Sequence, residues 1–377
     1  MKKIFVLTGE PSGDKLASKV ISKLKKIEPN IEYLSLGGEN LKAIGIESIF
    51  NINEVTYLGF TRVLLNIFKI KKKINETANK ILEFKPDILF SVDSPDFTLR
   101  VAKIVKQKLP SVKTVHFVAP QVWVWREGRV KKIKEFIDHI LLLFKFEKKY
   151  FEKENISCEF IGHPLLEEES KSIEENQSII KKKAIISIFP GSRVSEINRL
   201  VPILIKFIKL MNKKYDDFYY VFHTTTFLRE LLDAKLKKSE IDNYEITSNE
   251  IIKNHILKKS IFAVAKSGTV SLEICNKKIP SVIIYKMNFI NYLIIKILIK
   301  IKFANLINIA AKKMIIPELI QSNCNSSNIF KVVSEFIENP DKIKNQINET
   351  QVVLDSFKTK NLPTDLAANS LRKIISL

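Results

Sequence analysis

Residues 184–196 read AIISIFPGSRVSE, an apolar run that passes through a Gly-Ser turn into the start of an amphipathic stretch. This order predicts a buried strand, a tight loop and a helix, which together form one βα unit. Residues 3–14 and residues 261–273 have the same order. Repeated βα units build parallel sheets, whose ligands bind beyond the carboxyl ends of the strands. Functional side chains are therefore expected in the loops that follow the apolar runs.

Short apolar runs alternate with Lys-rich amphipathic stretches along most of the chain. Strands are expected at residues 3–7, 32–36, 88–92, 114–118, 139–144 and 159–161, and then at residues 184–189, 219–223, 261–265 and 281–285. Residues 167–183, EEESKSIEENQSIIKKK, are polar and lack periodicity, so they are expected to be a linker.

The pattern predicts an α/β protein with two Rossmann-like domains that face each other across a cleft. Residues 1–166 form the first expected domain and residues 184–350 the second. Residues 351–377 are expected to be a separate helical segment.

The composition narrows the classes of partner. The 377 residues include 62 Lys and Arg against 41 Asp and Glu, a formal net charge of +21, which favours anionic partners. A hydrophobic content of 45% excludes a disordered chain. The three Cys residues match no metal site or disulfide framework, which is typical of a reducing cytoplasm.

Two apolar stretches point to contact with a membrane surface. Residues 289–303, FINYLIIKILIKIKF, include three lysines and are shorter than the roughly 20 apolar residues of a span. They are expected to form a helix that is buried or interfacial. Residues 59–70, followed by three lysines, are typical of a basic amphipathic helix with Phe60 and Phe68 on one face. A core-facing helix is the alternative. The N-terminal apolar run is too short for a signal peptide.

Two loops of the first half carry carboxylates. The first strand is followed by Gly9-Glu10-Pro11-Ser12-Gly13-Asp14, where Ser12 is expected to cap the next helix. The glycine spacing is not that of a dinucleotide fingerprint. The third strand ends in Val92-Asp93-Ser94-Pro95-Asp96, so Asp93 lies where a carboxylate can take a proton from a bound hydroxyl. Asp96 is expected to contact substrate or to cap a helix that begins near Thr98.

Residues 116–126, HFVAPQVWVWR, contain both tryptophans of the chain beside an arginine. Trp125 and Arg126 are candidates for binding a sugar face, an acyl chain or a phosphate. An aromatic plug that closes the core is the alternative, above all for Trp123. His116 is expected to be a buried core histidine, and the Gly162-His163-Pro164 run is expected to be a hinge.

Two similar loops of the second half are suited to phosphate. Gly191-Ser192-Arg193 exposes backbone N–H groups at a helix N-terminus and adds a guanidinium that binds phosphate bidentately. Ser267-Gly268-Thr269 repeats the small-residue turn, and Glu273 follows one turn later as a possible ribose ligand. Together the loops favour a nucleotide-diphosphate site. No D-x-D motif or His/Cys cluster is present in the sequence, so neither a metal nor another cofactor is expected.

The runs DSPDF, PQVWVWR, FEKKY and FIGHPL, followed by FPGSRVSEI, SGTVSLE, NLINI and PELIQ, resemble the lipid-A-disaccharide synthase family. The resemblance extends in order from Gly9 to about Gln321. It implies a GT-B-like inverting glycosyltransferase, cytoplasmic and peripheral on the inner membrane. The implied reaction joins UDP-2,3-diacylglucosamine to 2,3-diacylglucosamine 1-phosphate and yields the β-1,6 disaccharide 1-phosphate and UDP. Homodimers are also implied, with residues 351–377 packed back on the first domain or exchanged between chains.

The resemblance assigns roles to individual residues. Asp93 is implied to be the catalytic base, and Glu10 is the second catalytic candidate. Arg193 and Asn308 are implied to contact UDP, although Ile307 replaces a frequent Pro and leaves the backbone at Asn308 less constrained. The substrate-binding residues expected on all these grounds are Ser12, Asp96, Trp125, Arg126, Arg193, Ser267, Gly268, Thr269, Glu273, Asn308 and Gln321.

Two other classes of function are alternatives. One is a different GT-B-like sugar-nucleotide enzyme, such as a UDP-sugar epimerase or a glycosyltransferase with a soluble acceptor, which has little use for the apolar stretches. The other is a non-catalytic nucleotide- or RNA-binding protein. Nucleic acid is not expected as a partner, because the aromatic residues lie mostly within apolar runs and not along a basic stripe.

Overall fold

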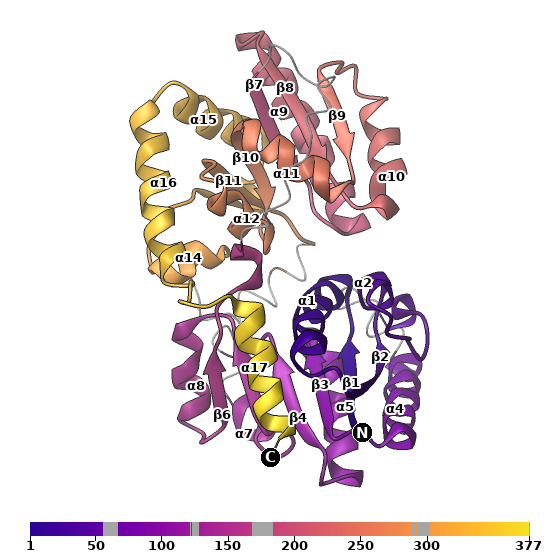
Figure 1. The fold of residues 1–377 in the computed structure, drawn as a ribbon. Helices are drawn as coiled ribbons and strands as arrows, with labels where there is room; N and C mark the ends of the chain where they lie inside the picture. The colour runs from indigo at the N-terminus through magenta and orange to yellow at the C-terminus, as the bar shows by residue number, and fades with distance from the viewer. Residues whose placement is uncertain are drawn as a thin grey trace. The chain divides into compact units, whose positions relative to one another are not determined.

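The structure is a computed structural model of the chain. It describes residues 1–55, 67–120, 122, 128–167, 184–288, 292 and 302–376. The chain divides into two compact units, both drawn in Figure 1. Unit 1 consists of Met1–Glu167 with Phe357–Leu377, and unit 2 consists of Glu168–Ser356.

Unit 1 is built on a parallel six-stranded sheet with the order β2-β1-β3-β4-β5-β6. Its strands are β1 (Lys2–Thr8), β2 (Ile31–Leu36), β3 (Ile88–Val92), β4 (Lys113–Phe117), β5 (His139–Leu142) and β6 (Ser157–Phe160). Its main helices are α1 (Pro11–Ile27), α2 (Glu39–Ala43), α4 (Ile67–Phe84), α5 (Pro95–Lys108), α7 (Arg129–Ile133), α8 (Lys148–Glu152) and α17 (Pro363–Ile375). The central strands β1 and β3 are almost wholly buried, because both faces of a parallel sheet are covered by helices.

Helix α17, the yellow helix at the C-terminal end of the chain in Figure 1, packs against α1 of the same unit. Lys23 and Asp365 form an ion pair at 2.9 Å between these two helices. At the start of α17, the Thr364 N–H donates to Glu167 Oε1 at 2.6 Å. The last helix of the chain thus belongs to the same unit as the first strand.

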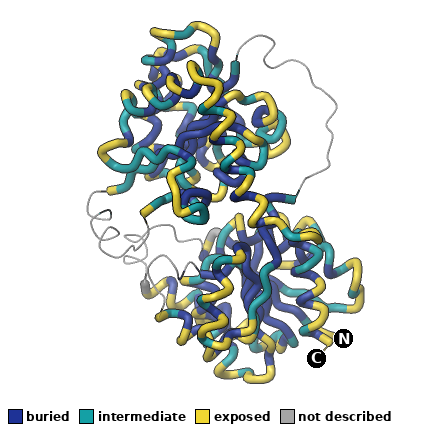
Figure 2. The backbone as a smooth tube through the Cα atoms, turned by 90° about the vertical axis from the view of Figure 1, so that its left-hand side faces the viewer, coloured by how far each residue is buried: buried dark blue, intermediate teal, exposed yellow. Residues whose placement is uncertain are grey.

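Unit 2 has a parallel six-stranded sheet with the order β12-β11-β10-β7-β8-β9. Its strands are β7 (Ala184–Phe189), β8 (Phe218–His223), β9 (Tyr244–Thr247), β10 (Ser260–Lys266), β11 (Ser281–Tyr285) and β12 (Glu318–Ile320). Its helices include α9 (Val194–Lys214), α10 (Thr226–Leu236), α11 (Glu250–Lys259), α12 (Val270–Asn276), α14 (Leu306–Ala311), α15 (Ser326–Ile337) and α16 (Pro340–Asp355). The tube in Figure 2 shows the buried residues concentrated in the interior of each unit.

The two sheets confirm the predicted α/β class with two Rossmann-like domains. The edge strands β9 and β12 were not predicted, because they are short, mix polar with apolar residues and are only partly buried. In both sheets the chain reverses its direction of winding between two neighbouring strands, β1 and β3 in unit 1 and β7 and β10 in unit 2. Loops diverge at such a switch point and leave room for a ligand at the carboxyl edge.

Several predictions concern residues outside the described part of the chain. These are the linker from residue 168 to 183, the loop with Trp123, Trp125 and Arg126, most of residues 289–303, and residues 59–66 of the amphipathic stretch. Residues 67–70 are described and form the start of α4. Among the described helices, none combines the length and the apolar character that a membrane crossing requires.

Candidate functional site

Asp93 directly follows β3, at the switch point of unit 1. Its N–H donates to the Phe117 carbonyl at 2.9 Å, and both Asp93 and Ser94 have left-handed backbone angles, with φ of 56° and 46°. A Cβ on Gly9 would lie 2.7 Å from the Ser94 Cβ, so only glycine lets the β1 loop pack this closely against the β3 loop. Two consecutive non-glycine residues in this region store backbone strain, which is common at functional sites.

The environment of Asp93 favours its protonated form. Burial raises the pKa of Asp93 above the usual range of an aspartate, although the Ser94 N–H and the Ser12 hydroxyl lower it by hydrogen bonding. Ser12 Oγ donates to Asp93 Oδ2 at 3.3 Å, which connects the two loops of the switch point. The result is a carboxylate with increased affinity for a proton, as a general base requires.

The structure corrects the expected role of Ser12 and shows what Asp14, the second acid of its loop, binds. Helix α1 begins at Pro11 with Glu10 as N-cap, so Ser12 lies in the first turn and caps nothing. Asp14 is buried and accepts hydrogen bonds from the N–H groups of Gly38 at 2.7 Å, Asn40 at 2.9 Å and Leu41 at 3.3 Å. Asp14 therefore holds the start of α2.

Asp96 lies in the first turn of α5, which begins at Pro95 and not near Thr98. The N-cap is Ser94, so the expected capping role of Asp96 is wrong. The Asp96 side chain is 74% exposed and pairs with Arg129 Nη2 at 3.1 Å. Arg129 also donates to the Pro95 carbonyl at 3.1 Å, and it thereby links α7 to the Asp93 loop.

Two of the three histidines of unit 1, His116 and His163, are internal. His116 is buried in β4 with its Nδ1 2.8 Å from Ser91 Oγ, and burial lowers its pKa to about 3. His163 is also buried, and its Nδ1 accepts a hydrogen bond from the Leu165 N–H at 3.2 Å. Both side chains are neutral at physiological pH and stabilise the domain from within.

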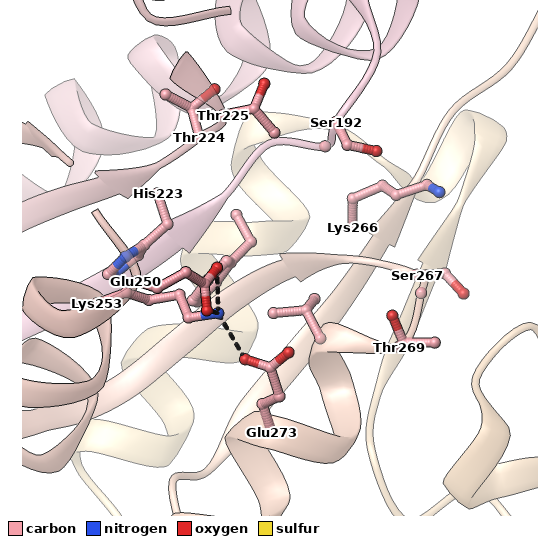
Figure 3. A pocket seen from close by; sticks show the side chains of 14 residues that line it. Ser192, His223, Thr224, Thr225, Glu250, Lys253, Lys266, Ser267, Thr269 and Glu273 are labelled. Atoms are coloured by element: carbon pink, nitrogen blue, oxygen red, sulfur yellow. Dashed lines mark hydrogen bonds and ion pairs between the residues drawn. The ribbon is translucent and has the colours of Figure 1, made fainter. Parts of the chain in front are cut away.

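Unit 2 has a pocket of about 260 Å³ at the carboxyl ends of β7, β8 and β10, shown in Figure 3. It brings together several predicted residues, namely Gly191, Ser192, Ser267, Gly268, Thr269 and Glu273. No motif in the sequence indicated its other polar lining residues, which are His223, Thr224, Thr225, Glu250, Lys253 and Lys266. Arg193 follows Ser192 as the half-buried N-cap residue of α9 and adjoins this lining.

A buried carboxylate, Glu196, connects the two phosphate-type loops of unit 2. Glu196 Oε2 accepts from the Ser192 N–H at 2.9 Å, and Glu196 Oε1 pairs with Lys266 Nζ at 3.1 Å. Gly191 has φ of 111°, and a Cβ there would lie 2.4 Å from Glu196 Oε2. The spacing of Gly191 and Glu196 in the FPGSRVSE run was the only sequence signal for this contact.

On the opposite side of the pocket, Lys253 stands between two acids, as the dashed lines in Figure 3 show. Lys253 Nζ is 2.7 Å from Glu273 Oε2 and 2.9 Å from Glu250 Oε2. Burial acts to lower the pKa of Lys253, but the two carboxylates outweigh it and hold the pKa above its ordinary value. Lys253 is therefore a stable cation within the pocket lining.

Asn308 differs from its expected role as a direct UDP ligand. It is fully buried, and its Oδ1 accepts from the Ile315 and Ile316 N–H groups at 2.8 and 2.9 Å. Its Nδ2 donates to the Ile316 carbonyl at 2.7 Å and to Glu318 Oε1 at 2.8 Å. All hydrogen-bonding capacity of the side chain is engaged within unit 2, so Asn308 supports the backbone.

The NLINI and PELIQ motifs form one hydrogen-bonded network. Glu318 accepts from the Ala304 and Asn305 N–H groups at 2.8 and 2.9 Å, and Gln321 Oε1 accepts from the Met287 N–H at 2.7 Å. The Ile307 N–H, which a proline would lack, donates to Asn305 Oδ1 at 2.8 Å. The substitution of Ile for Pro is thus compensated by an N-cap, and Gln321 orders the end of β11 through the backbone of Met287.

No three His, Cys, Asp or Glu side chains come together in a metal-binding arrangement among the described residues. The polar groups that the structure does assemble lie at two switch points, a proton acceptor in unit 1 and a pocket with cations and small-residue loops in unit 2.

The fold has close counterparts among solved structures. The S. aureus MnaA–UDP co-structure matches with a TM-score of 0.66 and 16% identity, over 100% of this chain and 96% of that chain. UDP-GlcNAc 2-epimerase from Neisseria meningitidis bound to UDP-GlcNAc matches with a TM-score of 0.62 and 14% identity, over 100% of both chains. These likenesses establish the class of fold, the GT-B-like pairing of two Rossmann-like domains.

Sequence relationship identifies the family within this class. The family model described as "Lipid-A-disaccharide synthetase" matches residues 4–370. The lipid-A-disaccharide synthase of Rickettsia bellii (strain OSU 85-389) is 38% identical over 384 residues, 99% of each chain. The chain belongs to the lipid-A-disaccharide synthetase family. The predicted resemblance and the glycosyltransferase class are confirmed, and the epimerase and RNA-binding alternatives are set aside.

Proposed function

We propose that the chain transfers 2,3-diacylglucosamine from its UDP derivative to 2,3-diacylglucosamine 1-phosphate, which yields the β-1,6 disaccharide 1-phosphate and UDP. Membership of the family supports the reaction. The observation that carries the mechanism is the position of Asp93 directly after β3 at the switch point of unit 1, where its carboxylate accepts from Ser12. The pocket of unit 2, with its two small-residue loops, is the proposed donor site.

In the proposed mechanism Asp93 takes the proton of the acceptor's primary hydroxyl. The hydroxyl oxygen then forms a bond to the anomeric carbon of the donor, with inversion. The bond between that carbon and the phosphate oxygen breaks, and UDP leaves with the electron pair. Arg193 and the N–H groups at the start of α9 stabilise the charge that develops on UDP. Ser267, Gly268 and Thr269 line the diphosphate region, and Glu273 accepts the ribose hydroxyls.

The reaction is tested by incubating the purified chain with both lipid substrates and detecting disaccharide 1-phosphate by mass spectrometry. The expected result is stoichiometric formation of disaccharide and UDP. A deacylated acceptor is the matched control, because a glycosyltransferase with a soluble acceptor would use it equally well. Release of UDP without disaccharide, in the presence of both substrates, would contradict the proposal.

Arg193→Ala is expected to weaken UDP binding about tenfold or more. A charge-assisted hydrogen bond to phosphate is worth about 1.5–3 kcal/mol, and each 1.4 kcal/mol corresponds to a factor of ten. Isothermal titration calorimetry measures the effect. Arg372→Ala removes the same charge from an exposed position on α17 and should leave the affinity unchanged. An unaltered UDP affinity of the Arg193→Ala variant would show that Arg193 does not bind the donor.

We also propose that unit 1 binds the cytoplasmic surface of the inner membrane through the start of α4. Phe68 is 87% exposed there, whereas Ile70 and Ile74 on the same helix are buried in the core. Lys69, Lys71 and Lys72 follow Phe68 in the sequence and are also exposed. An exposed aromatic ring among lysines suits an anionic lipid surface.

Phe68→Asp is therefore expected to reduce binding to anionic liposomes several-fold in a sedimentation assay. The thermal midpoint should not change, because the ring is outside the core. Phe227→Asp is the matched control, since Phe227 is 84% exposed on α10 of unit 2. Equal loss of binding in both variants would show a general effect of charge, and loss of folding in Phe68→Asp would place the ring in a packed interface.

A further inference from the structure

Lys253 and Glu273 form an ion pair that connects two elements of the unit 2 pocket. Lys253 is on α11 and Glu273 is on α12, and their side chains are only 14% and 21% exposed. Glu250, the second partner of Lys253, is 60% exposed and lies on the same helix three residues earlier. An ion pair with so exposed a partner contributes little to stability. The main effect of Lys253 is therefore to hold the Glu273 side chain in place.

The pair leaves the carboxylate of Glu273 only partly occupied. Lys253 holds Oε2 at 2.7 Å, and Oε1 accepts no hydrogen bond from any described residue. A carboxylate oxygen has two lone-pair sites, so both oxygens of Glu273 can still accept a hydroxyl donor from a ligand. Two neighbouring hydroxyl groups of a ribose match the spacing of two carboxylate oxygens.

We propose that Lys253 is a positioning residue for ribose recognition: it orients the Glu273 carboxylate and keeps it at the pocket wall. This inference rests on the proposed function, in which the pocket takes the nucleotide of the donor. Without the cation, Glu273 would face Glu250 with no opposite charge between them, and the repulsion would turn its carboxylate away from the ribose. The ion pair thus makes the pocket selective for ribose over 2′-deoxyribose. Glu273 contacts the ribose, and Lys253 acts only through Glu273.

The test compares UDP with 2′-deoxy-UDP by calorimetry on the full chain. Wild type is expected to bind UDP about tenfold or more tightly than 2′-deoxy-UDP, because a hydrogen bond to a charged acceptor is lost in the deoxy compound. In Lys253→Met the UDP affinity should fall and the preference should shrink to about threefold or less, with 2′-deoxy-UDP affinity little changed. Lys253→Arg keeps the charge and should retain the preference.

Two further variants isolate the mechanism. Glu273→Gln should abolish the preference, and Lys253→Met added to Glu273→Gln should have no further effect on either ligand. Such non-additivity is expected only if Lys253 acts through Glu273. The Glu273→Gln background also keeps the test valid if Lys253→Met alone does not fold. Lys209→Met, which breaks an exposed pair with Glu240, is the control for removing a lysine.

Each outcome decides between defined alternatives. A loss of affinity in Lys253→Met that is equal for UDP and 2′-deoxy-UDP would mean that Lys253 contacts the phosphates directly, and it would overturn the inference. Equal binding of both nucleotides to wild type would also overturn it, while the UDP site itself would stand. Absence of UDP binding in wild type would instead contradict the proposed donor site.

Discussion

Asp93→Asn is expected to lower turnover by about 10²–10⁴-fold, which is the typical contribution of a general base. Asparagine keeps the shape of the side chain and can still accept from Ser12, but it cannot accept the proton of the acceptor hydroxyl. UDP affinity should stay near wild type, because the proposed donor pocket is in unit 2. Steady-state kinetics and calorimetry on the same preparation measure the two quantities.

The stability of the variant separates catalysis from structure. Because burial raises the pKa of Asp93, the fold disfavours its ionised form, and a neutral Asn should not lower the thermal midpoint. Asp96→Asn is the internal control, since the Asp96 side chain is 74% exposed and its ion pair with Arg129 lies at the surface of unit 1. A joint fall in thermal stability and UDP affinity would indicate a structural Asp93. Near-normal turnover would show that Asp93 is not the base and would make Glu10 the next candidate.

The dependence on pH gives an independent check on Asp93. The base must be ionised, so kcat/KM should fall as the pH drops through a pKa that is raised above the usual range of an aspartate. Ser12→Ala removes a hydrogen bond that lowers this pKa, so the acid limb should move to higher pH. The free energy of unfolding should depend on pH in the opposite direction to kcat/KM. The folded chain holds the Asp93 proton more tightly than the unfolded chain, so the contribution of Asp93 to stability is present at low pH and is lost as the pH rises through the raised pKa.

Asn308→Ala is expected to destabilise unit 2 strongly. It leaves the Ile315 and Ile316 N–H groups and the Ile316 carbonyl without the side chain that satisfies them, whereas Glu318 Oε1 keeps its hydrogen bond from the Asn305 N–H. Each unsatisfied buried group costs about 1–3 kcal/mol, so a loss of about 3 kcal/mol or more in the free energy of unfolding is expected. For a unit of this size, that lowers the thermal midpoint by roughly 6–12 °C.

The control for this change is Asn323→Ala, at an exposed position of the same unit, which should alter the midpoint little. Below the transition, folded Asn308→Ala protein should bind UDP with an affinity within a few-fold of wild type. A midpoint equal to that of wild type, combined with a large loss of UDP affinity, would restore the direct contact that the sequence resemblance implies.

The sequence by itself determined the fold class and indicated the loops that form the proposed site. Strands and loops follow from local patterns, because burial on both faces requires apolar runs and a tight βα turn requires small residues. Asp93 and the loops at Gly191 and Gly268 were therefore found from order along the chain alone. The same patterns do not predict the edge strands β9 and β12. An edge strand is only partly buried, so its sequence mixes polar and apolar residues.

Only the tertiary structure decided which polar side chains act together. Glu196 meets Lys266, and Lys253 meets Glu273, across 70 and 20 residues of chain, and no local periodicity encodes such pairs. Asn308 and Asp14 have sequence contexts that suit a ligand, yet the fold uses their hydrogen-bonding capacity internally. The physical reason is that a buried polar group must find a partner, and the folded chain determines whether that partner is a ligand or the protein itself.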